Sequence, residues 1–151
     1  SLEIQRMPKN PQHEFGHTEE YPLRSVCTIS THDMSTLRGW WEEDATQTAN
    51  YYNHVLKCWG EVPATATGSI CEEVIRMHLQ SPSLLCILSF QDWLSMDENL
   101  RNPDVQAERI NVPANPRHYW RYRMHLTLEE LLHKKDFNKK LAQMIDEHGR
   151  N

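Results

Sequence analysis

The chain has 151 residues, a formal net charge of -5 and a pI near 6.0. Hydrophobic residues make up 38% and charged residues 25%, a composition typical of a folded chain and not of a disordered one. Basic side chains are scattered or interleaved with acids, so we expect no nucleic acid as a partner. No apolar run reaches the length of about 18 residues that a membrane helix needs, so we expect no membrane span.

Cysteine usage predicts a reducing environment. Four cysteines, Cys27, Cys58, Cys71 and Cys86, stand far apart and form no Cys-x-x-Cys pair. Their neighbours are rich in Val, Ile, Leu and Trp, which favours reduced thiols in a core. We therefore expect a cytoplasmic location.

The first 24 residues are polar and show no apolar period. Pro8, Pro11, Gly16 and Pro22 interrupt them. We predict that residues 1–24 are an irregular approach segment. The first regular element is then a strand over residues 25–30, a β-branched run that ends just before the polar pair His32-Asp33.

Helices are predicted between this strand and the next. Ser35 or Asp33 can cap a helical turn that begins near Thr36. A second helix from about Ala45 would end at Gly60 and Pro63, and its buried face would hold Tyr52, Val55, Leu56 and Trp59. A third would start near Thr67 or Ser69, turn Ile70, Val74, Met77 and Leu79 inward, and stop before Ser81-Pro82.

The apolar run of residues 84–88 is typical of a strand that is covered on both faces, as in a parallel sheet. The long connection between the two strands allows a right-handed crossover, so we predict an α/β architecture. Residues 97–125 are predicted to be irregular. Beyond them, Thr127 and Glu130 form a capping box, and Asp136 caps a last helix that carries Phe137, Leu141, Met144 and Ile145 and ends at Gly149.

His32 and Asp33 are the first candidates for a functional site. They follow a predicted parallel strand, and open α/β sheets and barrels place reactive groups at the carboxyl ends of their strands. The pair alone is a weak signal, because an Asp that follows a strand often only caps a helix.

Three separated segments raise this signal. Residues 30–41 (Ser-Thr-His-Asp-Met-Ser-Thr-Leu-Arg-Gly-Trp-Trp), 108–113 (Glu-Arg-Ile-Asn-Val-Pro) and 118–123 (His-Tyr-Trp-Arg-Tyr-Arg) resemble, in order and spacing, the 4-α-glucanotransferases known as amylomaltases or disproportionating enzymes. The pair Gln91-Asp92 is also similar to that family, and the resemblance runs from about Phe15 to Leu132.

The resemblance implies a fold and an activity. Residues 25–151 would be the C-terminal part of a single catalytic (β/α)₈ TIM barrel, helix-rich, with residues 25–30 as its seventh strand and 84–89 as its eighth. The parent enzyme would transfer α-1,4-glucan segments between maltooligosaccharides with retention of configuration and without a cofactor. Its nucleophile and its acid/base carboxylate would lie on earlier strands, so we expect this chain by itself to be inactive.

The resemblance also implies roles for single residues. Asp33 matches the third carboxylate of the site, which holds the hydroxyls of the distorted sugar, and His32 would bond the same sugar. Arg109 and Asn111 would bind substrate, although Arg109 could instead pair with Glu108 or Asp92 to brace its loop. Several tryptophans and a tyrosine could stack on sugars, but at helical spacing a tryptophan is more often a core residue: Trp40, Trp41, Trp120 and Tyr119. Glu42, Glu43 and Asp44 are expected to be solvated.

Two other functions remain open at this stage. One is a metal-dependent phosphohydrolase with His32 and Asp33 as ligands, although the closest histidine pair, His13 and His17, lies in the approach segment and no metal is expected. The other is a non-catalytic module that binds carbohydrate or protein. A few strands cannot close a barrel, so the chain alone should expose apolar surface, through which it could self-associate.

Overall fold

The computed structural model describes residues 1–150 and contains a three-stranded parallel sheet in the order β1-β2-β3. The strands are short: β1 is Leu2–Ile4, β2 is Val26–Thr28 and β3 is Leu85–Cys86. In register, Ile4 lies opposite Thr28, and Cys27 lies opposite Cys86. The α/β architecture is confirmed, and the sheet has one strand more than the two that the sequence predicted.

The extra strand lies in the segment that was expected to be irregular. Residues 1–24 hold β1 and a 3-10 turn at Thr18–Glu20. The hydrophobic pattern does not reveal β1, because Leu2 is exposed whereas the polar residues Glu3 and Gln5 are buried. Gln5 is satisfied inside by the hydroxyl of Tyr51, which donates to its Oε1 at 2.6 Å.

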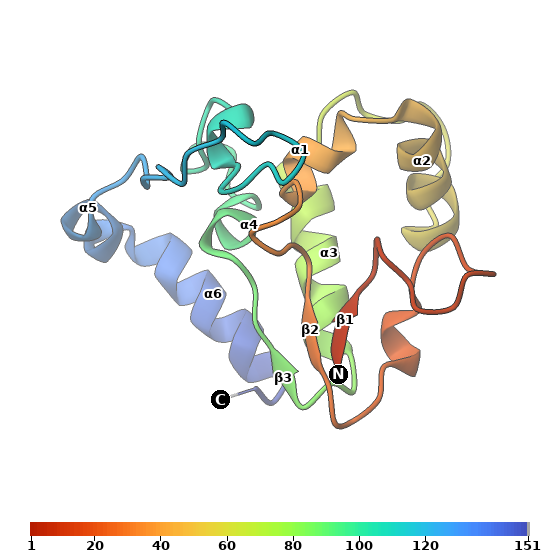
Figure 1. Ribbon diagram of the computed structural model, residues 1–151. Helices are drawn as coiled ribbons and strands as arrows, with labels where there is room; N and C mark the ends of the chain where they lie inside the picture. The colour runs from red at the N-terminus through yellow and green to blue at the C-terminus, as the bar shows by residue number, and fades with distance from the viewer. Residues whose placement is uncertain (151) are drawn as a thin grey trace.

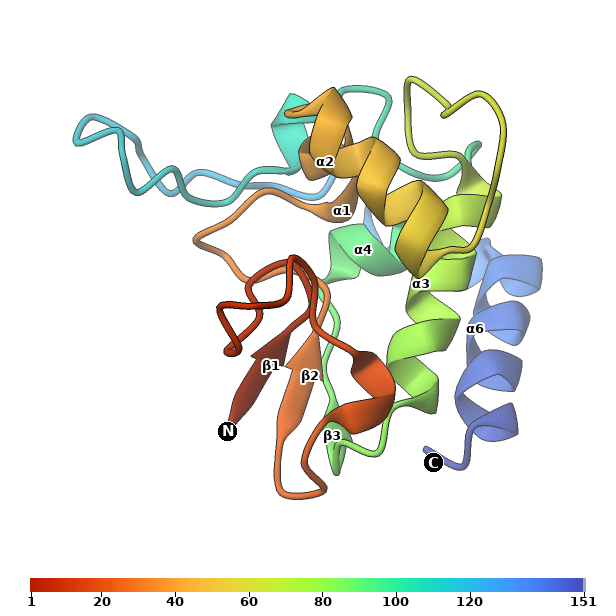
Figure 2. The same ribbon diagram turned by 90° about the vertical axis from the view of Figure 1, so that its right-hand side faces the viewer.

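Two long helices cover one face of the sheet. They are α3 (Gly68–Gln80) and α6 (Lys135–Glu147), which lie side by side behind the strands (Figures 1 and 2). Ion pairs join them, from Arg76 to Glu147 at 3.2 Å and from Lys140 to Glu72. No helix of the described residues covers the opposite face, which is open in Figure 2.

Shorter helical segments lie above the carboxyl ends of the strands and along one side. They are α1 (Leu37–Trp41), α2 (Ala45–Asn50), a π-helical turn (Tyr51–Val55), α4 (Phe90–Leu94) and a 3-10 turn (Gln106–Glu108). A last short helix, α5 (Leu128–His133), precedes α6. Between α4 and α5 the chain is otherwise irregular, and residues 111–126 extend away from the body beyond the open face of the sheet (Figure 2).

Sequence signals at the helix ends have mixed outcomes. Thr67 caps α3 by accepting the Ile70 N–H at 3.3 Å, and the capping box of Thr127 and Glu130 is present in both directions. Thr36 caps α1, in place of Ser35 or Asp33, and α6 begins at Lys135 with Asp136 in its first turn and not as its cap. Of the stripe predicted for α6, Phe137 and Met144 are buried, and Leu141 packs against the core while partly exposed.

An aromatic cluster fills the core beside α1. The rings of Phe15, Trp40, Trp41 and Tyr51 meet edge to face, with centroids 5.1 to 6.4 Å apart. Such contacts add to the free energy gained from burying these rings. Trp40 and Trp41 are therefore core residues, the more typical of the two roles considered for them.

Two predictions of burial are wrong. Trp59 is 75% exposed, because the helix that starts at Ala45 passes into the π-helical turn and ends before that residue. Lys57, two residues after the end of the π-helical turn, takes a positive φ of 56°. Leu84, Leu85 and Ile87, in and around β3, are exposed. The reason is that β3 lies at one edge of the sheet and that one face of the sheet is open. The expected exposure of apolar surface is thus confirmed.

The cysteines are free, with Cys27 and Cys71 fully buried and Cys58 and Cys86 partly so. Over residues 1–150, no helix combines the length and apolar character required to cross a membrane.

His78 in α3 makes the fold sensitive to pH. Its ring is buried, Nδ1 donates to the Val74 carbonyl at 2.8 Å, and Nε2 has no partner. Burial lowers the pKa of His78 from 6.5 to about 4. In the range between these values the unfolded chain binds a proton that the folded chain does not, so stability is lost as the pH falls below 6.5.

We therefore predict that His78→Leu removes a stability loss of about 3 kcal/mol on acidification. The measurement is the thermal unfolding midpoint of the full-length protein between about pH 4 and pH 8. His54→Leu, at an exposed position, is the control and should leave the pH profile unchanged. An unaltered profile in His78→Leu would contradict the assignment.

Candidate functional site

His32 and Asp33 lie in the loop that follows β2, at the carboxyl ends of the strands. Their side chains are about half exposed, at 55% and 53%. His32 Nε2 lies 3.3 Å from Asp33 Oδ2, and the Asp33 N–H donates to the Thr31 hydroxyl at 3.3 Å. The carboxylate is thus held next to the imidazole while both remain open to solvent.

Asn111 reaches this loop from a segment 78 residues further along the chain. Its Nδ2 donates to Asp33 Oδ1 at 2.7 Å, and its backbone N–H donates to the His32 carbonyl at 3.1 Å. The first bond orients the carboxylate, and the second fixes the backbone beside it. The structure therefore brings together three of the four residues that the sequence analysis selected.

Arg109, the fourth residue, points to the other end of the same loop. Its Nε donates to the Asn111 carbonyl at 2.7 Å, its Nη1 donates to the Ser35 hydroxyl, and Glu43 Oε1 lies 3.8 Å away. The predicted pairing of Arg109 with Glu108 or Asp92 is therefore wrong. Arg109 does brace the loop, but through Ser35, whose hydroxyl in turn donates to Glu43.

An aromatic side chain borders the cluster. The ring of Trp120 lies 5.2 Å from that of His32 and is tilted against it by 47°. Trp120 is 62% exposed, and its neighbour Tyr119 carries the Arg121 guanidinium 4.8 Å above its ring. One flat apolar surface is thus available beside His32.

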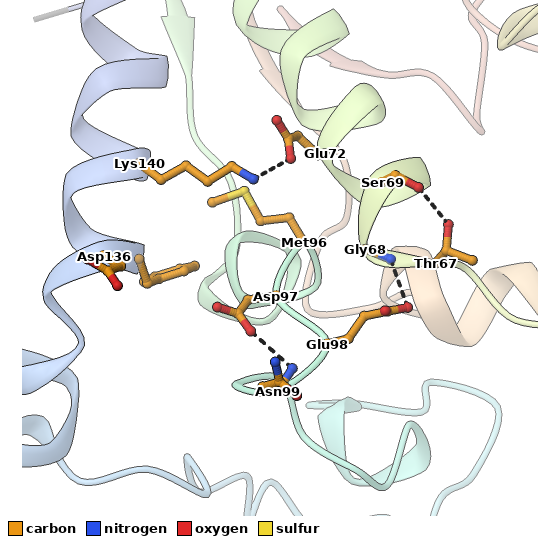
Figure 3. Close-up of a pocket in the computed structure, with 11 residues that line it drawn as sticks. Thr67, Gly68, Ser69, Glu72, Met96, Asp97, Glu98, Asn99, Asp136 and Lys140 are labelled. Carbon is orange, nitrogen blue, oxygen red and sulfur yellow. Dashed lines mark hydrogen bonds and ion pairs between the residues drawn. The ribbon is translucent and has the colours of Figure 1, made fainter.

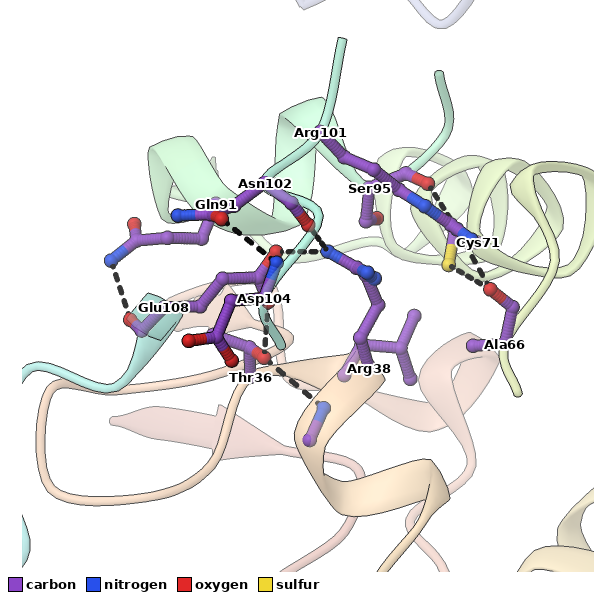
Figure 4. A network of polar contacts seen from close by, with 12 residues as sticks. Thr36, Arg38, Ala66, Cys71, Gln91, Ser95, Arg101, Asn102, Asp104 and Glu108 are labelled. Atoms are coloured by element: carbon purple, nitrogen blue, oxygen red, sulfur yellow. Dashed lines mark hydrogen bonds and ion pairs between the residues drawn. The ribbon is translucent and has the colours of Figure 1, made fainter. Parts of the chain in front are cut away.

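A buried ion pair anchors the segment that carries Arg109 and Asn111 (Figure 4). Arg38 of α1 donates to Glu108 Oε1, and the Thr36 hydroxyl donates to Glu108 Oε2 at 2.8 Å. Gln91 of α4 donates to the Glu108 carbonyl at 3.1 Å. Burial outweighs these contacts and raises the pKa of Glu108.

Asp92 supports α1 from beneath. It is fully buried, and its Oδ1 accepts the Leu37 N–H at 3.0 Å while Oδ2 accepts the Ser89 hydroxyl at 2.9 Å. Sequence reasoning noted Gln91-Asp92 but missed α4 and these anchoring roles. The available signal was Ser89, which caps α4 three residues before Asp92.

The pocket in Figure 3 lies elsewhere, between the start of α3, the turn after α4 and α6. Its polar groups bond one another: Lys140 pairs with Glu72, and Glu98 accepts the Gly68 N–H at 3.1 Å. None of the Asp33 cluster lines it. Across residues 1–150, no group of three His, Cys, Asp or Glu side chains is placed to hold a metal ion.

The polar side chains of this chain thus lie at the carboxyl ends of parallel strands, where α/β folds carry their functional sites. Residues 1–128 match the model of the 4-alpha-glucanotransferase family, and the chain belongs to this family.

The relatives are much longer than this chain. It is 38% identical over 150 residues to the 4-alpha-glucanotransferase DPE2 of Oryza sativa subsp. japonica, with 99% of this chain and 16% of that protein covered. It is 30% identical over 135 residues to the 4-alpha-glucanotransferase of Chlamydia pneumoniae, with 87% and 24% covered. The chain thus spans about a sixth to a quarter of the length of these relatives.

A solved structure supports the fold. The amylomaltase from Streptococcus agalactiae in complex with acarbose aligns with a TM-score of 0.62 and 23% identity. The alignment covers 87% of this chain and 23% of that one.

The Arg38–Glu108 pair gives a prediction. Arg38→Met should destabilise the protein by about 3 to 5 kcal/mol, because it leaves a buried carboxylate without its cation. The double variant Arg38→Met with Glu108→Leu should recover much of this loss, since no charge is then buried. Chemical unfolding of the full-length variants measures both, and a double variant no more stable than the single one would contradict this account.

Proposed function

We propose that this chain is part of an enzyme that transfers α-1,4-glucan segments between maltooligosaccharides with retention of configuration. Membership of the 4-alpha-glucanotransferase family supports the activity, and the contact between Asp33 and Asn111 supports the site. The single observation that carries the proposal is this cluster at the carboxyl end of β2, built from segments that the sequence separates by 78 residues.

Asp33 is proposed to bind the hydroxyls of the sugar next to the broken bond. A half-exposed carboxylate whose orientation is fixed can accept two hydroxyl protons, and such bonds strengthen when the ring distorts towards the oxocarbenium-like transition state. Asp33 would act in this way without being the nucleophile or the proton donor, two roles that retaining transfer assigns to a separate carboxyl pair about 5 Å apart.

We propose separate roles for His32, Asn111 and Arg109. His32 is proposed to bond the same sugar through its exposed imidazole, while Asn111 holds Asp33 and can offer its second amide proton to substrate. Arg109 contributes by fixing Ser35 and the Asn111 carbonyl, so its effect on substrate would pass through the loop.

The barrel is proposed as the setting of the site. The sheet order and its parallel strands fit consecutive strands of a (β/α)₈ barrel, with β2 and β3 as the seventh and eighth and β1 as the one before them. The open face of the sheet would then be the inner surface, and α3 and α6 would belong to the outer ring. The free thiols fit the cytoplasmic location that we also propose.

The family match favours glucan transfer over the metal-dependent phosphohydrolase and the binding module.

The decisive variant is Asp33→Asn in the full-length protein. It keeps the size and the Asn111 contact but removes the negative charge, so kcat for maltotriose disproportionation should fall by about 100- to 1000-fold. Asp136→Asn, at an exposed position in α6, is the matched control and should leave kcat unchanged. Equal rates for both variants would refute the role of Asp33.

A second prediction concerns the chain by itself. Residues 1–151 should show no disproportionation of maltotriose, because the proposed nucleophile and acid/base carboxylates lie outside them. The full-length protein serves as the positive control under the same conditions. Product formation by the isolated chain would contradict the proposed division of catalytic groups.

A further inference from the structure

Arg6 lies beneath the loop that carries Asp33. It follows Ile4 of β1 by two residues, and Ser30 follows Thr28 of β2 by two residues. Since Ile4 and Thr28 are opposite each other in the parallel register, Arg6 and Ser30 are at the same level just beyond the strands. The side chain of Arg6 is thereby directed at the point where the loop leaves β2.

The Arg6 guanidinium bonds both ends of this loop. Its Nη2 donates to the Ile29 carbonyl at 3.0 Å and to the Ser30 hydroxyl at 2.8 Å, where the loop begins. The same nitrogen lies 2.9 Å from the Ser35 carbonyl, where the loop ends. His32 and Asp33 lie between these two attachment points, so one nitrogen closes the loop around them.

The surroundings of the Arg6 guanidinium argue against a purely structural role. Its guanidinium lies 5.3 Å from the centroid of the Trp40 ring, and its Nε and Nη1 are buried without hydrogen-bond partners. Its hydrogen bonds all go to uncharged oxygens. Burial lowers the pKa of Arg6, against the attraction of the carboxylates of Asp92 and Glu43. A buried cation with unsatisfied donors costs stability, and an apolar side chain would fill the space at lower cost.

Ser35 receives a second arginine from the outside. Arg109 donates to its hydroxyl, whereas Arg6 donates to its carbonyl. The end of the loop is thus held between two guanidinium groups that come from distant segments, while Asn111 holds its middle through the His32 carbonyl.

We propose that Arg6 is a positioning residue, which closes the loop of residues 29–35 from beneath and thereby sets the direction in which Asp33 and His32 meet the sugar. This inference rests on the proposed glucan transfer for its catalytic consequence, but not for its effect on the loop. A displacement of reacting groups by about 1 Å can lower a rate by roughly 100-fold, so a loosened loop should affect kcat strongly.

The test uses Arg6→Met, Arg6→Lys and Arg150→Met in the full-length protein. Arg150 is the matched control, because its guanidinium also donates to backbone carbonyls that lie before a strand, those of Leu79, Ser81 and Ser83, next to the start of β3 and away from the loop. Lysine offers three donors on one nitrogen and can bridge the same three oxygens. Amide hydrogen exchange of residues 30–36 reports on the loop, and maltotriose disproportionation reports on kcat and KM.

Arg6→Met should speed exchange in residues 30–36 and lower kcat by about 10- to 100-fold, with a smaller change in KM. Arg6→Lys should restore most of both. Arg150→Met should alter neither, even if it lowers the unfolding temperature as much as Arg6→Met does.

The positioning role is overturned if Arg6→Met exchanges like the parent protein in residues 30–36, or if Arg150→Met loses kcat to the same extent. A parent protein without glucan transfer would refute the proposed function instead, and the exchange comparison would still decide the role of Arg6 in the loop.

Discussion

The contact between Glu108 and Arg38 is the constraint on which the arrangement of the site depends. It ties the segment after α4 to the start of α1. The loop that carries Asp33 leads directly into α1, and the segment after α4 carries Arg109 and Asn111. Asn111 lies three residues beyond Glu108, and Arg109 lies next to it. The other hydrogen bonds between this segment and the loop come from Arg109 and Asn111, and those made by their side chains are partly or fully exposed.

Such an anchor has a cost, since a buried carboxylate loses its hydration. Arg38 and Thr36 return part of that loss through hydrogen bonds to the carboxylate, and Arg38 is also bonded to the Asn102 carbonyl at 2.8 Å. A buried pair of this kind adds little net stability compared with apolar side chains, and here it joins two segments that are 70 residues apart in the sequence.

The elements with strong local signals were predictable. The 13-residue helix α3 and the capping box at Thr127 follow from residue types within a few positions, and β2 (Val26–Thr28) lies inside the β-branched run of residues 25–30. The strand β1 was not predictable, because Leu2 is exposed whereas Glu3 in the strand and Gln5 just after it are buried, and Gln5 finds its partner in the distant Tyr51. For the same reason Arg6 gave no sign in the sequence of its place beneath the loop.

The sequence by itself determined the class of fold, the position of His32 and Asp33 after a strand, and the family. It also selected Asn111, whose contact with Asp33 the structure contains. Only the tertiary structure decided which partners the charged side chains find: Arg109 meets Ser35 and Glu43, and Glu108 meets Arg38. Pairing depends on which side chains face one another across distant segments, and burial then decides which of them need a partner. Neither property is written in local sequence, because both arise only when the strands bring those segments together.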